Sequence, residues 1–528
     1  MSSNSNTSPE LGFGTIRSCI WPIHRHELRK VMPMFLMISL ICFNYGILRN
    51  MKDAIVVTAS GAEVIPFIKV WAMLPGAILL TFLFTKLSNY FSQERVFYFM
   101  MTGFLLCFAL FAFVLYPMRD TLHPHALADR LELLLPIGFR GLISMLRNWT
   151  FTGFYVMSEL WGGIILNVLF WGFANEVTRV QEARRFYSMF GIGANTAAIF
   201  AGQAAIFLTN ETTIKSILPL GSDIWEQSQM ILVAVIIFSG IATMCIFRWM
   251  NRNVLTDPSF DEFHHNKRVT KAKGKLSFRE SFSYLSNSNY LICIAILVIS
   301  YNLVINLVEV VWKDQLRLMC PDPTEFNTYL NNLTSCVGII SAILAIFMAK
   351  IISRFGWTNT ALITPAIMLV TCVGFFSFLL FQDKLSELAF ALTGSTPLMI
   401  AVFFGGVQNC LSKAAKYSVF DGTKEMAYIP LSHESKLKGK AAIDGVGSRL
   451  GKSGGSFIHQ GLLMVCSTLL ASAPYVAAIL MVVIGFWIVA VRILGKKFYD
   501  LVNSQQIGIS TEPEPQLAKE PLQVLKSA

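Results

Sequence analysis

Long apolar runs, separated by short polar segments, recur along the whole chain. The run from Val96 to Met118 contains no charged residue, and about 20 apolar helical residues suffice to cross the hydrocarbon core of a bilayer. The pattern predicts twelve transmembrane helices, with eleven as the alternative count. They are expected over residues 31–48, 64–84, 96–118, 141–173, 190–208, 231–247, 291–312, 333–348, 361–381, 397–411, 441–470 and 475–491.

The composition excludes a water-soluble enzyme. Of 528 residues, 54% are hydrophobic and only 14% are charged, against about 25% charged in an ordinary soluble domain. The ten cysteines never occur as Cys-x-x-Cys, so we expect neither disulfides nor metal ligands. The sequence therefore predicts an all-α integral membrane protein without a metal site or a cofactor.

Basic residues alternate between the predicted loops. Lys and Arg gather in every second connection, which marks the cytoplasmic side of a membrane protein. This distribution accounts for much of the net charge of +11 and predicts that both termini are cytoplasmic. The basic connections contain Lys86 and Arg95, Arg179, Arg184 and Arg185, Lys267 to Lys275, Lys350 and Arg354, and Lys424 to Lys440.

The predicted helices divide into two sets of six. A polar, basic segment near the middle of the chain has the character of a lipid-facing linker, and without interleaved aromatic residues it does not suggest a nucleic-acid site. The same interval separates Lys86 from Lys350 and Arg185 from Arg449, a weak repeat that parallel six-helix bundles of a major-facilitator-like transporter would produce. We predict a cytoplasmic segment 1–30, bundles 31–253 and 286–498, a linker 254–285 and a disordered cytoplasmic tail 499–528.

Several ionisable residues fall inside or beside the predicted spans. A charge near the bilayer centre costs at least about 2.5–3.5 kcal/mol on insertion scales, so each needs a partner, water or a substrate. Arg49 and Lys52 lie three residues apart and therefore on one helix face. They could bind an anion, or their side chains could simply extend to the outer membrane interface. Lys69 lies deeper in its span, after Pro66, which can loosen the helix.

Two carboxylates also interrupt apolar stretches. Glu159 and Glu309 are flanked by apolar residues on both sides. Each could pair with Lys69, Arg147 or Lys452, either as a structural partner or as part of a gate that opens when a substrate competes for the cation.

A glycine-rich stretch surrounds Lys452. Its sequence, Gly451-Lys-Ser-Gly-Gly455, suggests a phosphate-binding loop, but Val446 stands where a Walker motif needs glycine. A flexible backbone with exposed N–H groups beside Lys452 could still receive an anion. Close packing of helices at the glycines is the alternative.

Cations outnumber carboxylates within the predicted spans. Such an excess suits a polyanionic substrate, whose phosphates we expect to contact Arg49, Lys52, Lys69, Arg147 and Lys452, while Lys413 and Lys416 could lie near an interface. Aromatic residues, among them Tyr155 and Trp161, could stack on a base, although interfacial belts use the same residue types.

These motifs resemble the ATP/ADP translocases of plastids and obligate intracellular bacteria. The likeness runs from about Trp21 to Tyr499 and is nearest to the chlamydial members. It is carried by Ile-Leu-Arg49 with Lys52-Asp53, Ala-Glu-Val-Ile-Pro-Phe-Ile-Lys69, Ser-Glu159-Leu-Trp-Gly, Phe-Trp-Gly-Phe-Ala-Asn-Glu176, Asn-Leu-Val-Glu309-Val, Lys-Glu-Met-Ala-Tyr-Ile-Pro430 and Gly-Lys452-Ser-Gly-Gly.

The resemblance implies a nucleotide antiporter in the bacterial inner membrane that imports host ATP in exchange for ADP. It also implies transport roles for Lys69, Glu159, Glu309 and Lys452, the four residues already singled out by insertion cost. The substrates would be ATP and ADP, with no nucleic acid as a partner. A broad-specificity or proton-coupled importer of nucleoside triphosphates remains an alternative, and a membrane ATPase is a more remote one.

Overall fold

The computed structural model describes most of the chain. The described residues are 23–24, 27–178, 180–217, 223–255, 288–431, 439–440, 443 and 447–511. Every regular element within them is a helix, which confirms the predicted all-α class. The predicted linker 254–285 and the end of the predicted tail, from 512 onward, lie almost entirely outside these residues.

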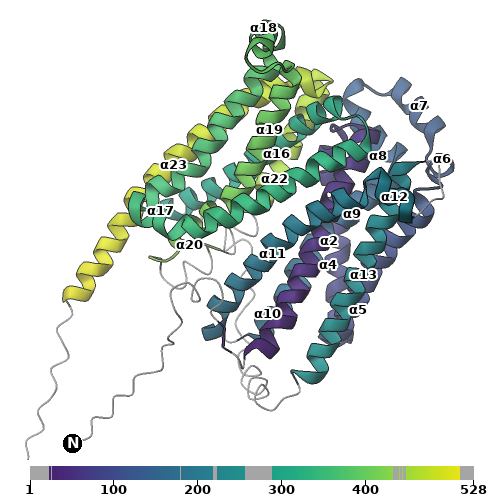
Figure 1. The fold of residues 1–528 in the computed structure, drawn as a ribbon. Coiled ribbons are helices and arrows are strands. Elements are labelled where there is room, and N and C mark those ends of the chain that lie inside the picture. The colour runs from purple at the N-terminus through teal and green to yellow at the C-terminus, as the bar shows by residue number, and fades with distance from the viewer. Residues whose placement is uncertain are drawn as a thin grey trace, which may run out of the picture.

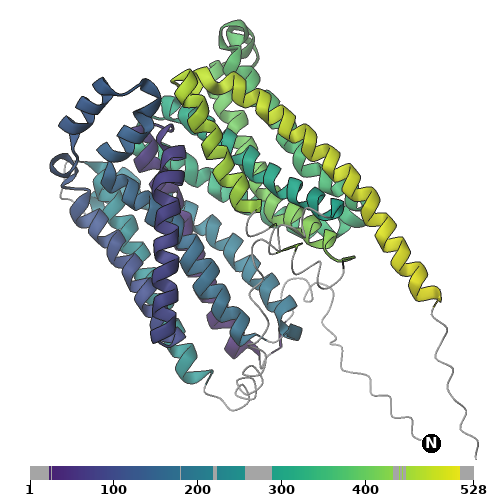
Figure 2. The ribbon, with the colours of Figure 1, turned by 180° about the vertical axis from the view of Figure 1, so that it is seen from behind.

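The helices form two groups that lie side by side (Figures 1 and 2). We call them the N-half, α2 to α13, and the C-half, α16 to α23. The N-half contains α2 (Leu28–Ser60), α3 (Val64–Phe67), α4 (Met73–Tyr90), α5 (Gln93–Leu110), α6 (Arg119–Leu122), α7 (His125–Leu134), α8 (Arg140–Arg147), α9 (Trp149–Trp161), α10 (Trp171–Val177), α11 (Val180–Leu208), α12 (Glu211–Ile217) and α13 (Ile224–Asn253).

The C-half comprises the remaining described helices. They are α16 (Asn289–Met319), α17 (Pro323–Leu380), α18 (Gln382–Thr393), α19 (Pro397–Ala415), α20 (Asp421–Ala427), α22 (Ser448–Cys466) and α23 (Leu469–Thr511). Wider π-helical turns join several helices of both halves: η2 (Ile68–Ala72), η3 (Phe111–Leu115), η5 (Gly162–Phe170) and η7 (Lys416–Phe420), while the 3₁₀ turn η4 covers Ile137–Phe139.

Capping residues in the sequence fix where the C-half helices begin. The Ser288 hydroxyl accepts a hydrogen bond from the Leu291 N–H before α16, and the Asp322 carboxylate accepts two before α17. Thr396 caps α19 in the same way, and Pro397 follows it at the first helical position. These are the residue types that satisfy the unpaired N–H groups of a helix start.

The described helices support a multi-pass membrane protein but not the count of twelve. Ten of them are long and apolar enough to cross a bilayer. The predicted spans 333–348 and 441–470 correspond to the first part of α17 and to α22, which are helical but do not belong to these ten. α17 covers two predicted spans, and Gly356, with a positive φ of 74°, interrupts the helical conformation between them.

Three boundaries differ from those expected. α2 continues to Ser60 instead of ending near residue 48, so the charges at 49–53 lie inside the helix. The fourth span begins at Trp149, because Asn148, with φ −106° and ψ 48°, interrupts the helix after α8. α23 extends to Thr511, into the predicted tail, and Leu501 and Val502 pack there against the apolar core.

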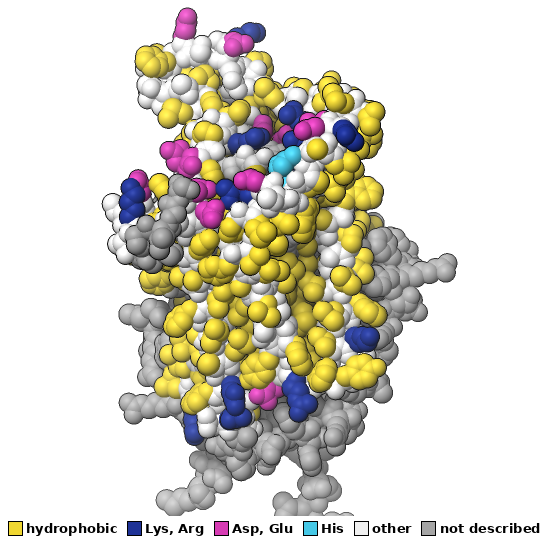
Figure 3. Space-filling model, turned by 90° about the vertical axis from the view of Figure 1, so that its right-hand side faces the viewer, with side chains coloured by type: hydrophobic (Ala, Val, Ile, Leu, Met, Phe, Trp, Pro, Cys, Tyr) yellow, Lys and Arg dark blue, Asp and Glu magenta, His cyan; other side chains and the backbone are white. Residues whose placement is uncertain are grey.

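The outer surface matches a bilayer environment. Figure 3 shows a broad apolar belt, with Lys and Arg gathered at its lower edge and charges of both signs at its upper edge. Large apolar side chains such as Phe82, Phe238 and Phe486 are about two-thirds or more exposed, which water would penalise and lipid would not.

The two halves contact each other toward one end. They converge toward the end at which α7, α8 and α18 lie and diverge toward the end at which α2 begins and α23 ends (Figures 1 and 2). Asn50 of α2 donates to the Asn331 side chain of α17 at 2.7 Å, and Gln203 of α11 donates to Ser335 at 2.9 Å. The Gln460 amide of α22 donates to the Pro66 carbonyl at 2.9 Å. Polar side chains therefore close this end of the interface.

Candidate functional site

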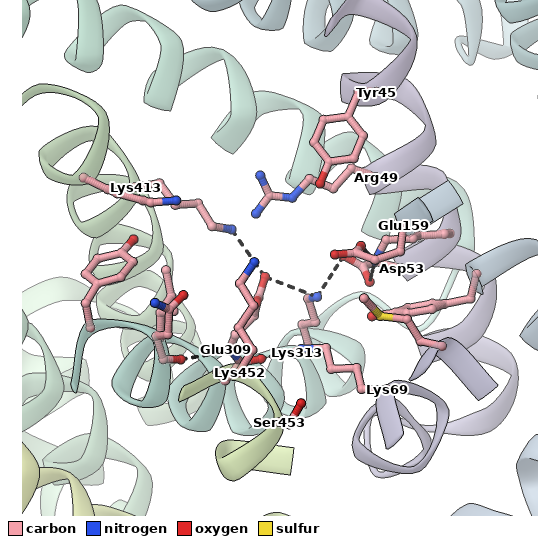
Figure 4. Close-up of a pocket in the computed structure, with 18 residues that line it drawn as sticks. Tyr45, Arg49, Asp53, Lys69, Glu159, Glu309, Lys313, Lys413, Lys452 and Ser453 are labelled. Atoms are coloured by element: carbon pink, nitrogen blue, oxygen red, sulfur yellow. Dashed lines mark hydrogen bonds and ion pairs between the residues drawn. The ribbon is translucent and has the colours of Figure 1, made fainter. Parts of the chain in front are cut away.

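A cavity of about 190 Å³ lies between the two halves. Side chains from α2, η2, α9, α16, α19, η7 and α22 converge on it (Figure 4). The described residues that line it are Tyr45, Arg49, Lys52, Asp53, Lys69, Met73, Tyr155, Glu159, Tyr301, Asn302, Ile305, Asn306, Glu309, Lys313, Lys413, Lys416, Lys452 and Ser453.

Positive charge dominates this lining. Three carboxylates, Asp53, Glu159 and Glu309, face seven cations, so the described lining carries a formal excess of four positive charges. A nucleoside triphosphate carries about four negative charges. The cavity therefore has the charge that would neutralise such an anion. The seven cations are Arg49, Lys52, Lys69, Lys313, Lys413, Lys416 and Lys452.

Ion pairs connect most of these charges into a single network. In the N-half, Lys52 lies 3.0 Å from Asp53 and 3.3 Å from Glu159. In the C-half, Glu309 lies 3.3 Å from both Lys313 and Lys413. Glu159 and Glu309 thus form their ion pairs with Lys52, Lys313 and Lys413. The sequence had suggested Lys69, Arg147 or Lys452 as their partners.

One ion pair of the network joins the two halves. Asp53 of α2 accepts a hydrogen bond from Lys313 of α16 at 2.8 Å, and both side chains are about 95% buried. Desolvating two charges costs several kcal/mol, which their attraction repays only with good geometry. A buried ion pair is therefore weak evidence for stability, and this one links α2 of the N-half to α16 of the C-half.

Lys69 reaches the cavity from a π-helical turn. Pro66 in α3 lacks an N–H group, and the chain widens into η2 two residues later. A π-turn adds one residue to the helix and redirects the side chains around it, and such turns are frequent at functional sites. Lys69 donates to the Asn306 amide oxygen of α16 at 2.5 Å, so in the described structure its hydrogen-bond partner is neutral.

Lys452 and Ser453 also line the cavity, but the stretch around them is not a flexible loop. It belongs to the regular helix α22, so its N–H groups are not presented to an anion, and the expectation of exposed backbone donors was wrong. A Cβ on Gly451 would lie 2.7 Å from the Asn302 Cβ and 2.8 Å from the Ile299 carbonyl oxygen. The glycine allows α22 to pack closely on α16, which points Lys452 into the cavity.

The two aromatic candidates have different environments. Tyr155 lines the cavity, and the Lys52 ammonium lies 3.8 Å from its ring centroid. Trp161 does not belong to the described lining: it is fully buried, donates to the Ile41 carbonyl at 3.1 Å and packs edge-on against Phe104. The position of Trp161 is that of a core residue.

Arg147 also lies away from the cavity. It ends α8, before the spanning helix begins, and pairs with Asp129 at 2.6 Å and Glu132 at 3.2 Å. The apolar residues around it in the sequence belong to two separate helices, which the hydropathy pattern merges into one span.

Sequence reasoning missed two charged residues of the network. Neither Asp53 nor Lys313 is assigned a site role from the sequence, because both lie beyond the predicted apolar spans 31–48 and 291–312. Both helices continue past these residues. The signal in the sequence is the spacing of Glu309 and Lys313, four residues apart, which pairs them on one helix face.

The fold and the site together define a class. An all-helical, multi-pass membrane protein in two halves, with a charged cavity between them, belongs to the major-facilitator-like fold class. A D-xylose–proton symporter has a similar fold, with a TM-score of 0.53 at 11% identity, over 88% of this chain and 97% of that one. A bacterial metal transporter gives 0.51 at 11% identity, over 89% and 98%.

Comparison of the sequence identifies the family. The family model described as the TLC ATP/ADP transporter matches residues 6–498. The chain is 47% identical to ADP,ATP carrier protein 1 of Chlamydia pneumoniae, over 93% of this chain and 95% of that protein. It is 42% identical to the chloroplastic ADP,ATP carrier protein 1 of Arabidopsis thaliana, over 92% and 77%. The chain therefore belongs to the TLC ATP/ADP transporter family, whose members are transporters and not enzymes.

Proposed function

We propose that this protein exchanges ATP for ADP across a bacterial inner membrane, with both termini in the cytoplasm. The observation that carries the proposal is the excess of positive charge in the cavity between the halves. The names of the chlamydial and chloroplastic relatives support ATP and ADP as the substrates. With cytoplasmic termini, the end at which the helices of the two halves diverge would face the cytoplasm.

The proposed phosphate contacts are made by Arg49, Lys52, Lys69 and Lys452. All four line the cavity, whereas Arg147 pairs with acidic residues elsewhere and is not retained. Charge-assisted hydrogen bonds from ammonium and guanidinium groups are about twice as strong as neutral ones. They would hold the phosphates between the halves, where both halves can respond to them.

The proposed gate is the ion-pair network around Asp53. Phosphate oxygens entering the cavity would compete with Asp53 for Lys52 and Lys313, and with Glu309 for Lys313 and Lys413. Releasing Asp53 would uncouple α2 from α16 and allow the closed end to open. An empty cavity would keep its network and stay closed, so a carrier could reorient only when loaded, which produces exchange.

Transport by liposomes containing the purified protein tests the proposal. Vesicles would be loaded with ADP, with GDP or with no nucleotide, and uptake of labelled ATP would be measured with and without a pH gradient. Uptake that requires internal ADP supports exchange. Uptake into empty vesicles that follows the pH gradient would replace exchange with proton-coupled import, with Glu159 or Glu309 as the protonated group.

A further inference from the structure

A second cavity adjoins the cationic one. It has a volume of about 330 Å³ and lies between α2, α11, α16 and α17. The two cavities have a common wall, because the same side chains line both. The shared residues are Tyr45, Arg49, Asp53, Glu309, Lys313 and Lys413.

Beyond that wall the second cavity is largely apolar. Its lining there includes Leu166, Trp312, Leu330, Leu333 and Val337. The indole N–H of Trp312 donates to the Val402 carbonyl at 3.0 Å, which fixes the orientation of the ring without using a group of the cavity. An anion would lose hydration in such surroundings without compensation, whereas a flat, weakly polar ring would not.

The sizes of the two cavities also complement each other. Small-molecule sites usually measure about 300–1,000 Å³. The cationic cavity, at 190 Å³, falls below this range and suits a chain of phosphates better than a whole nucleotide. The cationic cavity and its neighbour of 330 Å³, taken together, fall within this range.

From this juxtaposition we infer that the apolar chamber between α11 and α17 binds the nucleobase of the transported nucleotide, while its phosphates occupy the cationic cavity. The inference rests on the proposed function and adds the location of the base. The ribose, which joins the base to the phosphates, would then lie at the shared wall, where it would contact Arg49 and Tyr45. Affinity for the phosphates and affinity for the base would come from different helices.

Variants that fill the chamber separate the two contributions. Ala198 lines the chamber from α11 and is half-buried, so Ala198→Leu would occupy space reserved for the base. Ala194→Leu, one helical turn earlier and also in the lining, provides a second variant. Thr196→Leu serves as the matched control, because residue 196 is exposed on the same helix and does not belong to the chamber lining.

The measurement is competition in ADP-loaded liposomes. Unlabelled ATP and inorganic triphosphate would each be titrated against uptake of labelled ATP. We expect the chamber variants to weaken inhibition by ATP by about tenfold or more, the scale of lost base contacts. Inhibition by triphosphate should stay unchanged, and Thr196→Leu should match the unmodified protein. An unchanged ratio of the two inhibition constants in both chamber variants would overturn the inference.

Photolabelling of the unmodified protein gives an answer that does not depend on the variants folding. An azidoadenine analogue of ATP should label peptides of α11 and the Leu330–Val337 segment of α17. Labelling confined to the Tyr301–Ile305 segment of α16, which lines only the cationic cavity, would contradict the chamber. Failure of the proposed function is distinguishable, since the unmodified protein would then show no ATP/ADP exchange at all.

Discussion

Lys69 differs from three other lysines of the cavity in its hydrogen-bond partner. Lys52, Lys313 and Lys413 pair with carboxylates, whereas Lys69 donates to the neutral amide of Asn306. A phosphate that displaces an amide breaks no ion pair. Binding a phosphate at Lys69 would therefore cost less electrostatic energy than binding one at Lys52, Lys313 or Lys413.

We expect Lys69→Gln to lower the affinity for ATP by at least about tenfold, because a charge-assisted hydrogen bond contributes about 1.5–3 kcal/mol. The measurement is the concentration dependence of ATP uptake in ADP-loaded liposomes. Lys86→Gln is the matched control, since Lys86 is exposed at the far end of α4. Equal affinities of the two variants would remove Lys69 from the site.

Arg147→Gln should leave the affinity for ATP unchanged, because its guanidinium lies outside the cavity and pairs with Asp129 and Glu132. The variant should instead affect stability slightly, since partly exposed ion pairs contribute at most about 1 kcal/mol. Parallel measurement of ATP uptake and of the thermal unfolding temperature would check both statements. A tenfold loss of affinity in a stable variant would return Arg147 to the candidate residues.

The sequence predicts part of the site well. Insertion cost singles out Lys69, Glu159, Glu309 and Lys452, and the structure brings all four into one cavity. Hydropathy alone cannot place Asp53 or Lys313, because it does not register how far a helix continues past its apolar run. The transport roles assigned to the four residues singled out by insertion cost remain predictions.

At the scale of helices, the contact between α22 and α16 depends on glycine. Gly451 of α22 lies against Asn302 and Ile299 of α16, with no room for a Cβ. A lipid bilayer provides no hydrophobic force between helices, so close backbone approach of this kind contributes much of their association. The position of Lys452 in the cavity follows from that contact.

We expect Gly451→Ala to destabilise the protein by about 1–3 kcal/mol, the usual cost of overpacking, and to reduce ATP uptake by displacing Lys452. Gly461→Ala on the same helix is the control, because a Cβ there meets nothing within 4 Å. Thermal unfolding in detergent and ATP uptake would be compared for the two variants. A Gly451→Ala protein as stable and active as the control would disprove the packing role.

Helix positions were more predictable than helix details. Apolar runs gave the all-helical membrane fold, which the structure confirms, while the count of twelve is not confirmed. The π-turns could not be foreseen, because no residue type specifies them and they depend on packing against neighbouring helices. Yet η2 and η7 carry Lys69 and Lys416, and η5 begins three residues after Glu159.

At the scale of the whole molecule, the halves are held together at only one end by the contacts described. Gln203 and Ser335 belong to this closed end and come from different halves. Alternating access requires this contact to separate in every cycle.

Cross-linking this contact should therefore stop transport. In a background where exposed Cys107, Cys245 and Cys336 are serine, Gln203→Cys and Ser335→Cys would be joined by a short bis-methanethiosulfonate, which forms a reducible disulfide with each thiol. ATP uptake should fall to the level of protein-free liposomes and return when the link is reduced. Each single variant treated alike is the control, and full activity of the linked protein would refute separation at this end.

Loss of the bridge between halves should have the opposite effect. Asp53→Asn would remove the carboxylate shared by Lys52 and Lys313 and weaken the closed state of the empty carrier. We expect uptake of ATP into vesicles without internal nucleotide to rise several-fold relative to exchange. Asp129→Asn, which alters an ion pair outside the cavity, is the control and should show no such uptake. If Asp53→Asn still required internal nucleotide, Asp53 would not be part of the gate.

On the proposed mechanism, membrane voltage should act differently on the ATP-loaded and ADP-loaded carrier, because the lining charge is the same in both. Bound ATP, with about four negative charges, neutralises the four excess positive charges of the described lining. Bound ADP, with about one charge fewer, leaves one uncompensated. One elementary charge moved through 100 mV is worth about 2.3 kcal/mol. On the proposed mechanism the electrical current of exchange therefore arises in the ADP-loaded step, and the ATP-loaded step proceeds independently of membrane potential.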